Sequence, residues 1–140
     1  MANQQIAIIG LGRFGSSVAH TLYQMGHDVL ALEMDATRVQ EAMGQVTYPV
    51  QGDATQEAVL KELGIPNFDM AVVAIGSNVE ASIMSTVLLK SMGVPHIVAR
   101  AKTQLHGQTL ERVGADVVVH PEQETGEHVA RGLFHPEVQD

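Results

Sequence analysis

Residues 6–15 read IAIIGLGRFG, an apolar run that leads directly into a GxGxxG turn formed by Gly10, Gly12 and Gly15. Glycines in such a turn allow a tight reversal and let the backbone approach a pyrophosphate closely. The helix expected to follow would direct its unpaired N–H groups and the positive end of its dipole at the anion. This stretch therefore predicts a phosphate-binding turn between a first strand and a first helix.

A second apolar run, from Asp28 to Glu33, ends in an acidic residue. It follows the glycines by about 20 residues, the spacing of the ribose-binding carboxylate in dinucleotide-binding units. A carboxylate at Glu33 can accept hydrogen bonds from both ribose hydroxyls and would repel a 2′-phosphate. The pair of motifs predicts an adenosine-type ligand of the NAD or ATP kind rather than NADP.

Short aliphatic runs alternate with helical patterns along the whole chain, which is typical of a parallel sheet covered on both faces. We therefore predict an α/β fold, a doubly wound, Rossmann-like parallel six-stranded sheet of order 3-2-1-4-5-6. The predicted strands are 5–10, 28–33, 46–51, 69–75, 96–101 and 116–119. The predicted helices are 14–26, 35–43, 55–63, 78–92, 103–113 and one that begins near 122.

Two helical segments carry further expectations. Glycines directly after the first five helical patterns predict left-handed C-caps; they are Gly26, Gly44, Gly64, Gly93 and Gly114. The segment from Val79 to Met92 is apolar on more than one face. Part of it is expected either to meet another subunit or a missing domain, or to be buried under the final helix.

Length and composition limit the function. The 140 residues fit one domain, 1–140, and leave no room for the separate substrate domain of a dehydrogenase. A net charge of -8 makes nucleic acid an unfavourable partner. The sequence has no cysteine and no signal-peptide pattern, and its seven histidines lack metal-ligand spacing. We expect a protein that is not an enzyme.

The ends of the later predicted strands supply the remaining candidates. Asp53 could read the edge of a base, or Asp53 or Thr55 could instead cap the third helix. Gly76 would let the backbone close over the ribose or phosphates, whereas Ser77 and Glu80 form a capping-box pattern that needs no ligand.

Charged residues lie at or just after the ends of the first, fifth and sixth predicted strands. Arg13 and Arg100 could neutralise a polyphosphate, because guanidinium groups bind phosphate oxygens strongly. Glu122 beside those phosphates could hold Mg²⁺ or Ca²⁺ through its oxygens.

Four motifs together resemble a known family. They are residues 9–15 (IGLGRFG), 52–55 (GDAT), 73–76 (VAIG) and 114–122 (GADVVVHPE). In their joint spacing the chain is similar to the N-terminal, TrkA-N lobe of regulator-of-potassium-conductance (RCK) domains, in the nucleotide-binding subunits of Ktr- and Trk-type potassium uptake systems. The family's C-terminal lobe does not follow within these 140 residues.

The resemblance implies roles for single residues. Gly10, Gly12 and Gly15 would face the phosphates, Arg13 would reach a third phosphate, and Glu33, where close relatives more often have Asp, would hold the ribose. The adenine would be bordered by Asp53, Ala54 and Thr55, a phosphate would be met by Arg100, and a divalent cation by Glu122. Phe14, Ile75 and Gly76 belong to the motifs and are counted with the cofactor site.

The resemblance also implies a function. The chain would be a cytoplasmic regulatory subunit that gates a potassium-translocating membrane protein by binding ATP or ADP, or alternatively NAD or NADH. It would form dimers and larger rings, commonly octameric, and would reach the inner face of the membrane through its partner. The alternative from a different class is the cofactor-binding half of an NAD-dependent dehydrogenase.

Overall fold

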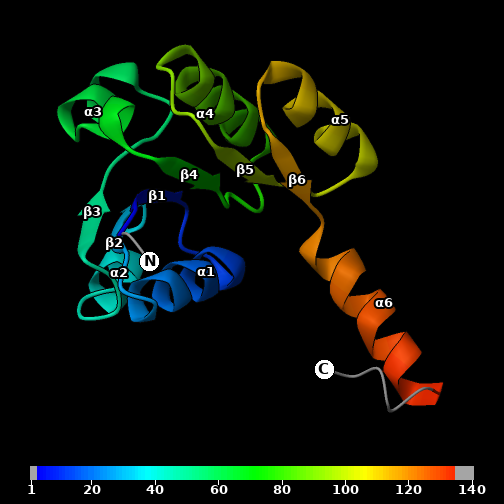
Figure 1. Cartoon of the computed structure of the whole chain (residues 1–140). Helices are drawn as coiled ribbons and strands as arrows, with labels where there is room; N and C mark the ends of the chain where they lie inside the picture. The colour runs from blue at the N-terminus through cyan, green and yellow to red at the C-terminus, as the bar shows by residue number, and fades with distance from the viewer. Residues whose placement is uncertain (1–2, 135–140) are drawn as a thin grey trace.

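The computed structural model of the chain describes residues 3–134. Its six strands form an all-parallel sheet of order β3-β2-β1-β4-β5-β6, with helices on both faces (Figure 1). The α/β fold predicted from the sequence, with its doubly wound Rossmann-like topology, is therefore confirmed.

The elements lie close to the predicted segments. The strands are β1 (Gln5–Ile9), β2 (Asp28–Glu33), β3 (Tyr48–Gln51), β4 (Met70–Val73), β5 (Ile97–Arg100) and β6 (Val117–Val119). The helices are α1 (Arg13–Gln24), α2 (Ala36–Glu41), α3 (Glu57–Glu62), α4 (Val79–Ser91), α5 (Gln104–Val113) and α6 (Pro121–Phe134). A short 3-10 helix, η1 (Ile65–Asn67), was not expected from the sequence pattern.

The sheet separates two apolar cores. On one side, Ile6 and Ile8 of β1 pack in a cluster with Phe14, Val18 and Leu22 of α1. On the other side, the alternate residues of β1 pack in a cluster that contains Leu60, Leu89 and Leu110 from α3, α4 and α5. Burial on both faces explains why the strands read as continuous apolar runs rather than as alternating ones.

The helix ends agree only partly with the sequence. Gly26, Gly44, Gly64, Gly93 and Gly114 all have positive φ, between 75° and 131°, so the predicted left-handed stops are confirmed. The two N-cap predictions are wrong. Gln56, rather than Asp53 or Thr55, is the N-cap residue of α3. At α4, Asn78 replaces the predicted Ser77–Glu80 box, and its Oδ1 accepts a hydrogen bond from the Ala81 N–H at 3.0 Å.

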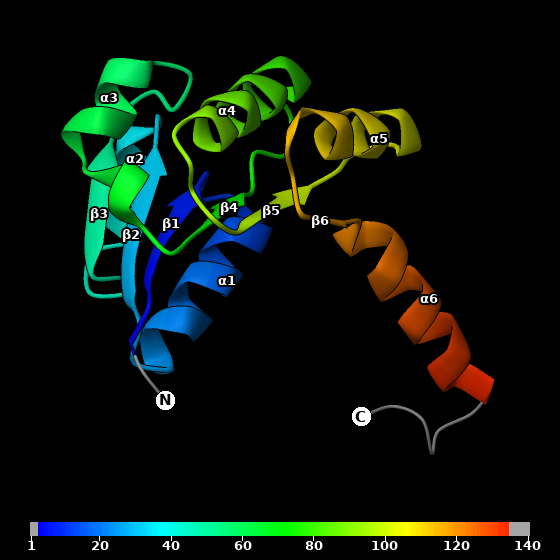
Figure 2. The same ribbon diagram turned by 45° about the horizontal axis from the view of Figure 1, so that its top comes forward.

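The last helix, α6, leaves the body of the molecule and points away from α4 in both ribbon views (Figure 2). Within the described residues α4 packs mainly against α5 and the sheet, and its Met84 and Val87 side chains stay exposed. The alternative that the final helix buries the surplus apolar residues of α4 is therefore wrong. None of the helices within residues 3–134 has the length and apolar character that a membrane span requires.

Candidate functional site

A cavity of about 430 Å³ opens beyond the carboxyl ends of β1 to β5. It lies where the strand order reverses between β1 and β4, the place at which doubly wound sheets bind ligands. Residues that end or follow successive strands line it, and these include Gly10, Glu33, Asp53, Gly76 and Arg100.

The glycine-rich turn packs tightly under the start of α1. Gly10 has φ +100°, and its N–H donates to the carbonyl oxygen of Leu32 at 2.9 Å. A Cβ on Gly15 would lie 2.0 Å from the Gly10 carbonyl oxygen, so α1 can rest on the turn only because Gly15 has no side chain. Gly12 is the N-cap residue of α1 and, as a glycine, leaves the N–H groups of the first turn open to an anion.

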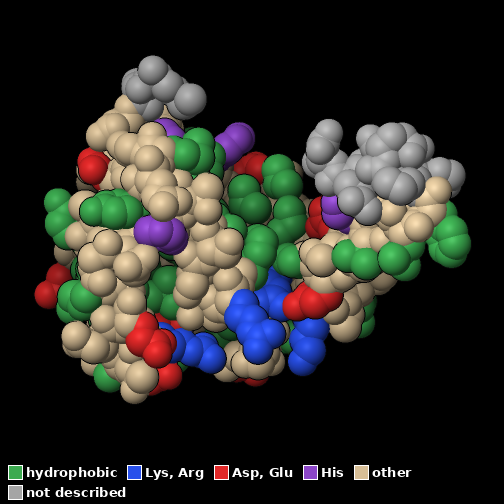
Figure 3. All heavy atoms as spheres, turned by 90° about the horizontal axis from the view of Figure 1, so that it is seen from below, with side chains coloured by type: hydrophobic (Ala, Val, Ile, Leu, Met, Phe, Trp, Pro, Cys, Tyr) green, Lys and Arg blue, Asp and Glu red, His purple; other side chains and the backbone are tan. Residues whose placement is uncertain are grey.

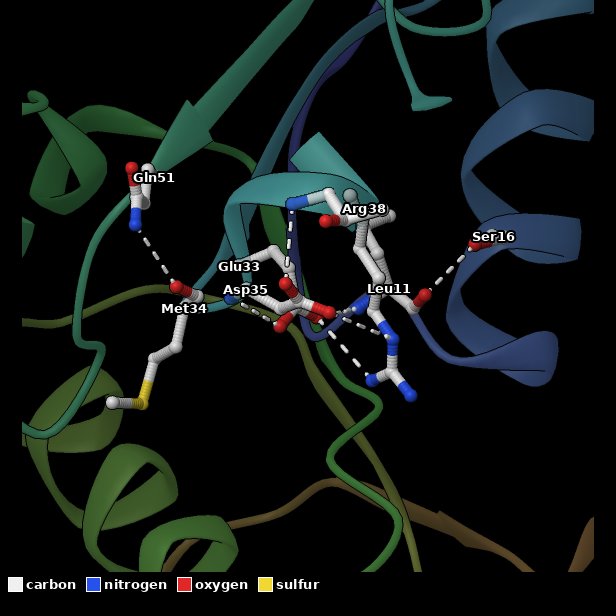
Figure 4. A network of polar contacts seen from close by, with 8 residues as sticks. Leu11, Ser16, Glu33, Met34, Asp35, Arg38 and Gln51 are labelled. Atoms are coloured by element: carbon white, nitrogen blue, oxygen red, sulfur yellow. Dashed lines mark hydrogen bonds and ion pairs between the residues drawn. The ribbon is translucent and has the colours of Figure 1, made fainter. Parts of the chain in front are cut away.

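Glu33 is held rigidly at the next position around the cavity. Its side chain is 9% exposed; Oε1 accepts a hydrogen bond from the Leu11 N–H at 2.7 Å, and Oε2 accepts one from the Asp35 N–H at 2.9 Å (Figure 4). Arg38 Nη1 lies 4.0 Å from Oε1. Each carboxylate oxygen keeps a second lone pair, so the fixed group can still accept hydrogen bonds from the two hydroxyls of a ribose.

Beyond β3 the chain forms a compact acidic turn. Asp53 Oδ1 accepts hydrogen bonds from Thr55 Oγ1 at 2.7 Å and from the Thr55 N–H at 2.9 Å. The hydrogen bond from the Thr55 hydroxyl, followed by that from its backbone, holds the pKa of Asp53 below its usual value. A charged acceptor with a fixed direction therefore lies at the end of the cavity nearest to β3.

At the opposite end, Arg100 lies against Phe14 and pairs with Glu122 at the start of α6. Its guanidinium carbon is 5.9 Å from the centre of the Phe14 ring. A Cβ on Gly76 would lie 2.9 Å from Arg100 Nη1, so the guanidinium fills the space beside Gly76 that a side chain would take. Arg100 Nε is buried and has no hydrogen-bond partner within residues 3–134. Figure 3 shows Lys and Arg side chains gathered where α6 leaves the body.

The sequence pattern of the TrkA-N domain matches residues 6–121. The chain belongs to the TrkA-N domain family. This confirms the resemblance that the four motifs indicated.

The relatives of this TrkA-N domain include two proteins of Bacillus subtilis. The Ktr system potassium uptake protein A is 43% identical over 131 residues, which cover 94% of this chain and 59% of that protein. The Ktr system potassium uptake protein C is 41% identical and is covered to 62% of its length, against 98% of this chain. The chain thus spans about three fifths of these relatives. The crystal structure of the GsuK RCK domain superposes with a TM-score of 0.81 at 26% identity, over 96% of this chain and 29% of that one.

Most of the predicted site residues of this TrkA-N domain lie together. Those that line the cavity are Gly10, Gly12, Glu33, Asp53, Ala54, Thr55, Ile75, Gly76 and Arg100. Arg13 is exposed at the first position of α1, outside the cavity wall, whereas Gly15 is buried beneath the turn and Phe14 packs under Arg100. These three residues surround the site instead of lining it.

Glu122, the predicted metal ligand, lies at the edge of the site and pairs with Arg100. Within residues 3–134 no cluster of three or more acidic or histidine side chains could hold a metal ion. A cation that used Glu122 would have to compete with the Arg100 guanidinium and take its remaining oxygens from a phosphate or from water.

The TrkA-N cavity also has wall residues that the sequence did not reveal. Met34 and Arg38 line it beside Glu33, and Asn78 and Ser85 of the α4 region line the opposite side. No motif marks them, because their place depends on how the loops after β2 and β4 leave the sheet.

His106, to which the sequence assigned no role, joins α4 to the loop after β5. Its Nδ1 accepts a hydrogen bond from the Lys102 N–H at 2.9 Å, and its Nε2 lies 3.0 Å from Ser82 Oγ. Because Nδ1 is an acceptor, the neutral ring carries its proton on Nε2 and donates it to the serine. Burial, and then the nearby His120 and Lys102, lower the pKa of His106 below its ordinary value of 6.5.

This contact makes the stability of the domain pH-dependent. In the unfolded chain His106 takes up a proton more readily than in the folded one, so its contribution is complete above about pH 6.5 and is lost as the pH falls through the lower folded pKa. Each unit of pKa difference corresponds to about 1.4 kcal/mol. We expect urea denaturation to show a smaller loss of stability from pH 7.5 to 5.5 in His106→Gln than in the wild type. An equal loss in both would contradict this assignment.

Proposed function

We propose that this TrkA-N domain senses an adenine nucleotide, ATP or ADP or alternatively NAD or NADH, and thereby regulates a membrane protein that carries potassium. One observation supports the proposal most. The Glu33 carboxylate is fixed by the Leu11 and Asp35 N–H groups beside the open first turn of α1. A ribose hydroxyl pair and a phosphate would meet complementary groups at the spacing of a nucleotide.

The cavity chemistry favours binding over catalysis. Among the described residues, the charged groups of its wall are Glu33, Arg38, Asp53 and Arg100. Each of the four is engaged with a neighbour. Glu33 contacts the Leu11 N–H and Arg38, Asp53 contacts Thr55, and Arg100 contacts Glu122. General acid–base catalysis needs a group within reach of a substrate proton and with a pKa near the working pH. The arrangement is better suited to holding a ligand, so we infer a regulatory protein.

The names of the relatives support the partner. Both Bacillus subtilis relatives are Ktr system potassium uptake proteins. We infer a potassium-translocating membrane protein as the partner, which would keep this domain at the inner face of the membrane and otherwise in the cytoplasm. The divalent cation predicted at Glu122 would reach the site together with the nucleotide.

Exposed apolar side chains suit a homo-oligomer, a dimer or a ring such as an octamer. The projecting α6 exposes Val129, Leu133 and Phe134, and α4 exposes Met84 and Val87. Apolar surface of this kind is commonly covered by a protein partner. Regulation then requires that ATP and ADP favour different arrangements of the subunits, because a ligand with equal affinity for both arrangements shifts neither.

Ligand preference tests the proposal. Thermal unfolding is measured with ATP, ADP, AMP, NAD, NADH and NADP, since stabilisation follows the ratio of ligand concentration to dissociation constant. We expect ATP and ADP to raise the midpoint and NADP to leave it unchanged. Stabilisation by NAD with none by ATP would favour the dehydrogenase alternative, and no stabilisation by any of them would refute nucleotide sensing.

Arg13→Ala is expected to weaken ATP binding more than ADP binding. Arg13 is exposed at the start of α1, outside the cavity wall, so a third phosphate could reach it. A charged hydrogen bond is worth about 1.5–3 kcal/mol, which is roughly a 10- to 100-fold change in affinity. Calorimetry should show that loss for ATP and much less for ADP. Arg112→Ala, which removes another exposed charge, from α5, is the matched control. Equal losses for ATP and ADP in Arg13→Ala would contradict the role.

A further inference from the structure

Met34 stands out among the cavity residues because its side chain is not packed. It follows Glu33 directly, lines the cavity and is 64% exposed. When a ligand covers a large apolar side chain at the mouth of a cavity, apolar surface is removed from water, and this favours binding. Met34 is therefore placed to contact a bound molecule.

The backbone of Met34 is nevertheless held in place. Its carbonyl oxygen accepts a hydrogen bond from Gln51 Nε2 at 3.2 Å, and the next N–H, that of Asp35, donates to Glu33 at 2.9 Å (Figure 4). Gln51 ends β3 and is followed by the Gly52–Asp53 turn, which lies at the end of the cavity nearest to β3, where the base is expected. The Met34 side chain thus begins at a fixed backbone position between the carboxylate expected to hold the ribose and the end of the cavity expected to hold the base, while the side chain itself is largely exposed.

We propose that Met34 covers the base of the bound nucleotide and that oxidation of its thioether by a peroxide weakens nucleotide binding. The inference rests on the proposed nucleotide-sensing function and adds a redox response to it. A thioether packs favourably on an aromatic ring through its polarisable sulfur, and a purine offers such a ring.

The oxidation is a transfer of one oxygen atom. The sulfur lone pair attacks one oxygen of hydrogen peroxide, the S–O bond forms, the O–O bond breaks, and the second oxygen leaves as water after a proton shift. The sulfur is oxidised by two electrons and the peroxide is reduced by two. The product is a polar, chiral sulfoxide in place of a flexible apolar group, so the contact with the base is lost.

Two other exposed methionines provide internal controls. Met25 and Met43 are 58% and 52% exposed, so peroxide should reach them about as easily as it reaches Met34. Neither lines the cavity, and neither belongs to α4 or α6, whose exposed apolar side chains are proposed to meet another subunit. A bound nucleotide should therefore shield Met34 and leave the others unchanged.

The first experiment measures protection. The full chain is treated with hydrogen peroxide, with and without saturating ATP, and the sulfoxide at each methionine is followed by peptide mass spectrometry. We expect ATP to slow the oxidation of Met34 at least fivefold and to leave the rates at Met25 and Met43 unchanged. Unchanged oxidation of Met34, or an equal slowing at all three, would overturn the inference.

The second experiment measures affinity. After peroxide treatment we expect the wild type and Met43→Leu to bind ATP five- to tenfold more weakly by calorimetry, whereas Met34→Leu should bind equally well before and after treatment. The same loss in treated Met34→Leu would overturn the inference. If the untreated wild type binds ATP and Met34 is not protected, this inference alone fails. If it binds no adenine nucleotide, the proposed function fails and this inference with it.

Discussion

In the Gly15→Ala variant we expect nucleotide binding to fall by at least a hundredfold and the free energy of unfolding to drop by about 3 kcal/mol, the upper part of the range for overpacked sites. The added Cβ would lie 2.0 Å from the Gly10 carbonyl oxygen and 3.0 Å from the Cβ of Ala74. Gly10 has a positive φ, and its N–H donates a hydrogen bond to Leu32, so the turn cannot easily move away from the added Cβ. The start of α1 must move, and its N–H groups then no longer converge on one phosphate.

Gly12→Ala is the matched control. A Cβ on Gly12 would meet no other atom of the described residues within 4 Å, and Gly12 has φ −73°, which any residue adopts. The free energy of unfolding should fall by no more than about 1 kcal/mol, the cost of alanine in place of glycine at an N-cap. Because Gly12 lines the cavity, ATP affinity should still decrease. Urea denaturation and calorimetry on both variants separate packing from ligand contact, and equal stability of the two variants would contradict the packing argument.

The sheet order and the element types could be predicted because they depend on local patterns. Apolar runs of strand length, each followed by a helical pattern and a glycine, admit few topologies once right-handed crossovers are required. Gly26 and Gly64 are examples, since a glycine in the left-handed conformation is a common way for a helix to end. These signals do not depend on distant parts of the chain.

The first residues of the helices were harder to predict, because several neighbouring residues are suited to the N-cap position. Asp53 and Thr55 are both good N-cap types, yet their side chains bond to each other and α3 begins after Gln56. Ser77 and Asn78 are adjacent, and the path of the loop after β4 decides between them. Propensity alone cannot order neighbours that differ by a few tenths of a kcal/mol.

In the candidate site, too, some residues could be identified from the sequence, whereas the contacts that position them arise only in the folded chain. Glu33 could be proposed from its spacing to the glycines, but the backbone N–H groups that orient it belong to Leu11 and Asp35, and only the folded loops bring them together. Met34 and His106 carry no motif either. Met34 is distinguished by its exposure beside the cavity. His106 is distinguished by its hydrogen bonds, which join α4 to the loop after β5.

Replacing Glu33 by alanine is expected to lower ATP affinity about 100-fold and the free energy of unfolding by about 2–3 kcal/mol. The ribose loses a charged acceptor, worth about 1.5–3 kcal/mol. In addition, the N–H groups of Leu11 and Asp35 lose their acceptor, and a buried unpaired donor costs about 1–3 kcal/mol. Calorimetry with ATP and urea denaturation measure the two effects. Undiminished ATP binding by Glu33→Ala would contradict the ribose assignment.

The Glu33→Gln variant removes the negative charge of this side chain and keeps its size, so it tests the effect of the charge alone. The amide has the size of the carboxylate, and its oxygen can still accept one of the two backbone hydrogen bonds, but its NH₂ group faces the other N–H as a second donor. We therefore expect a smaller loss of stability than in Glu33→Ala, together with weaker ATP binding. Removing the negative charge also removes the repulsion of a 2′-phosphate, and Arg38, 4.0 Å from Oε1, remains to attract one. The ratio of NADP to NAD affinity should rise in Glu33→Gln, whereas an unchanged ratio would mean that the charge of Glu33 does not set the ligand preference.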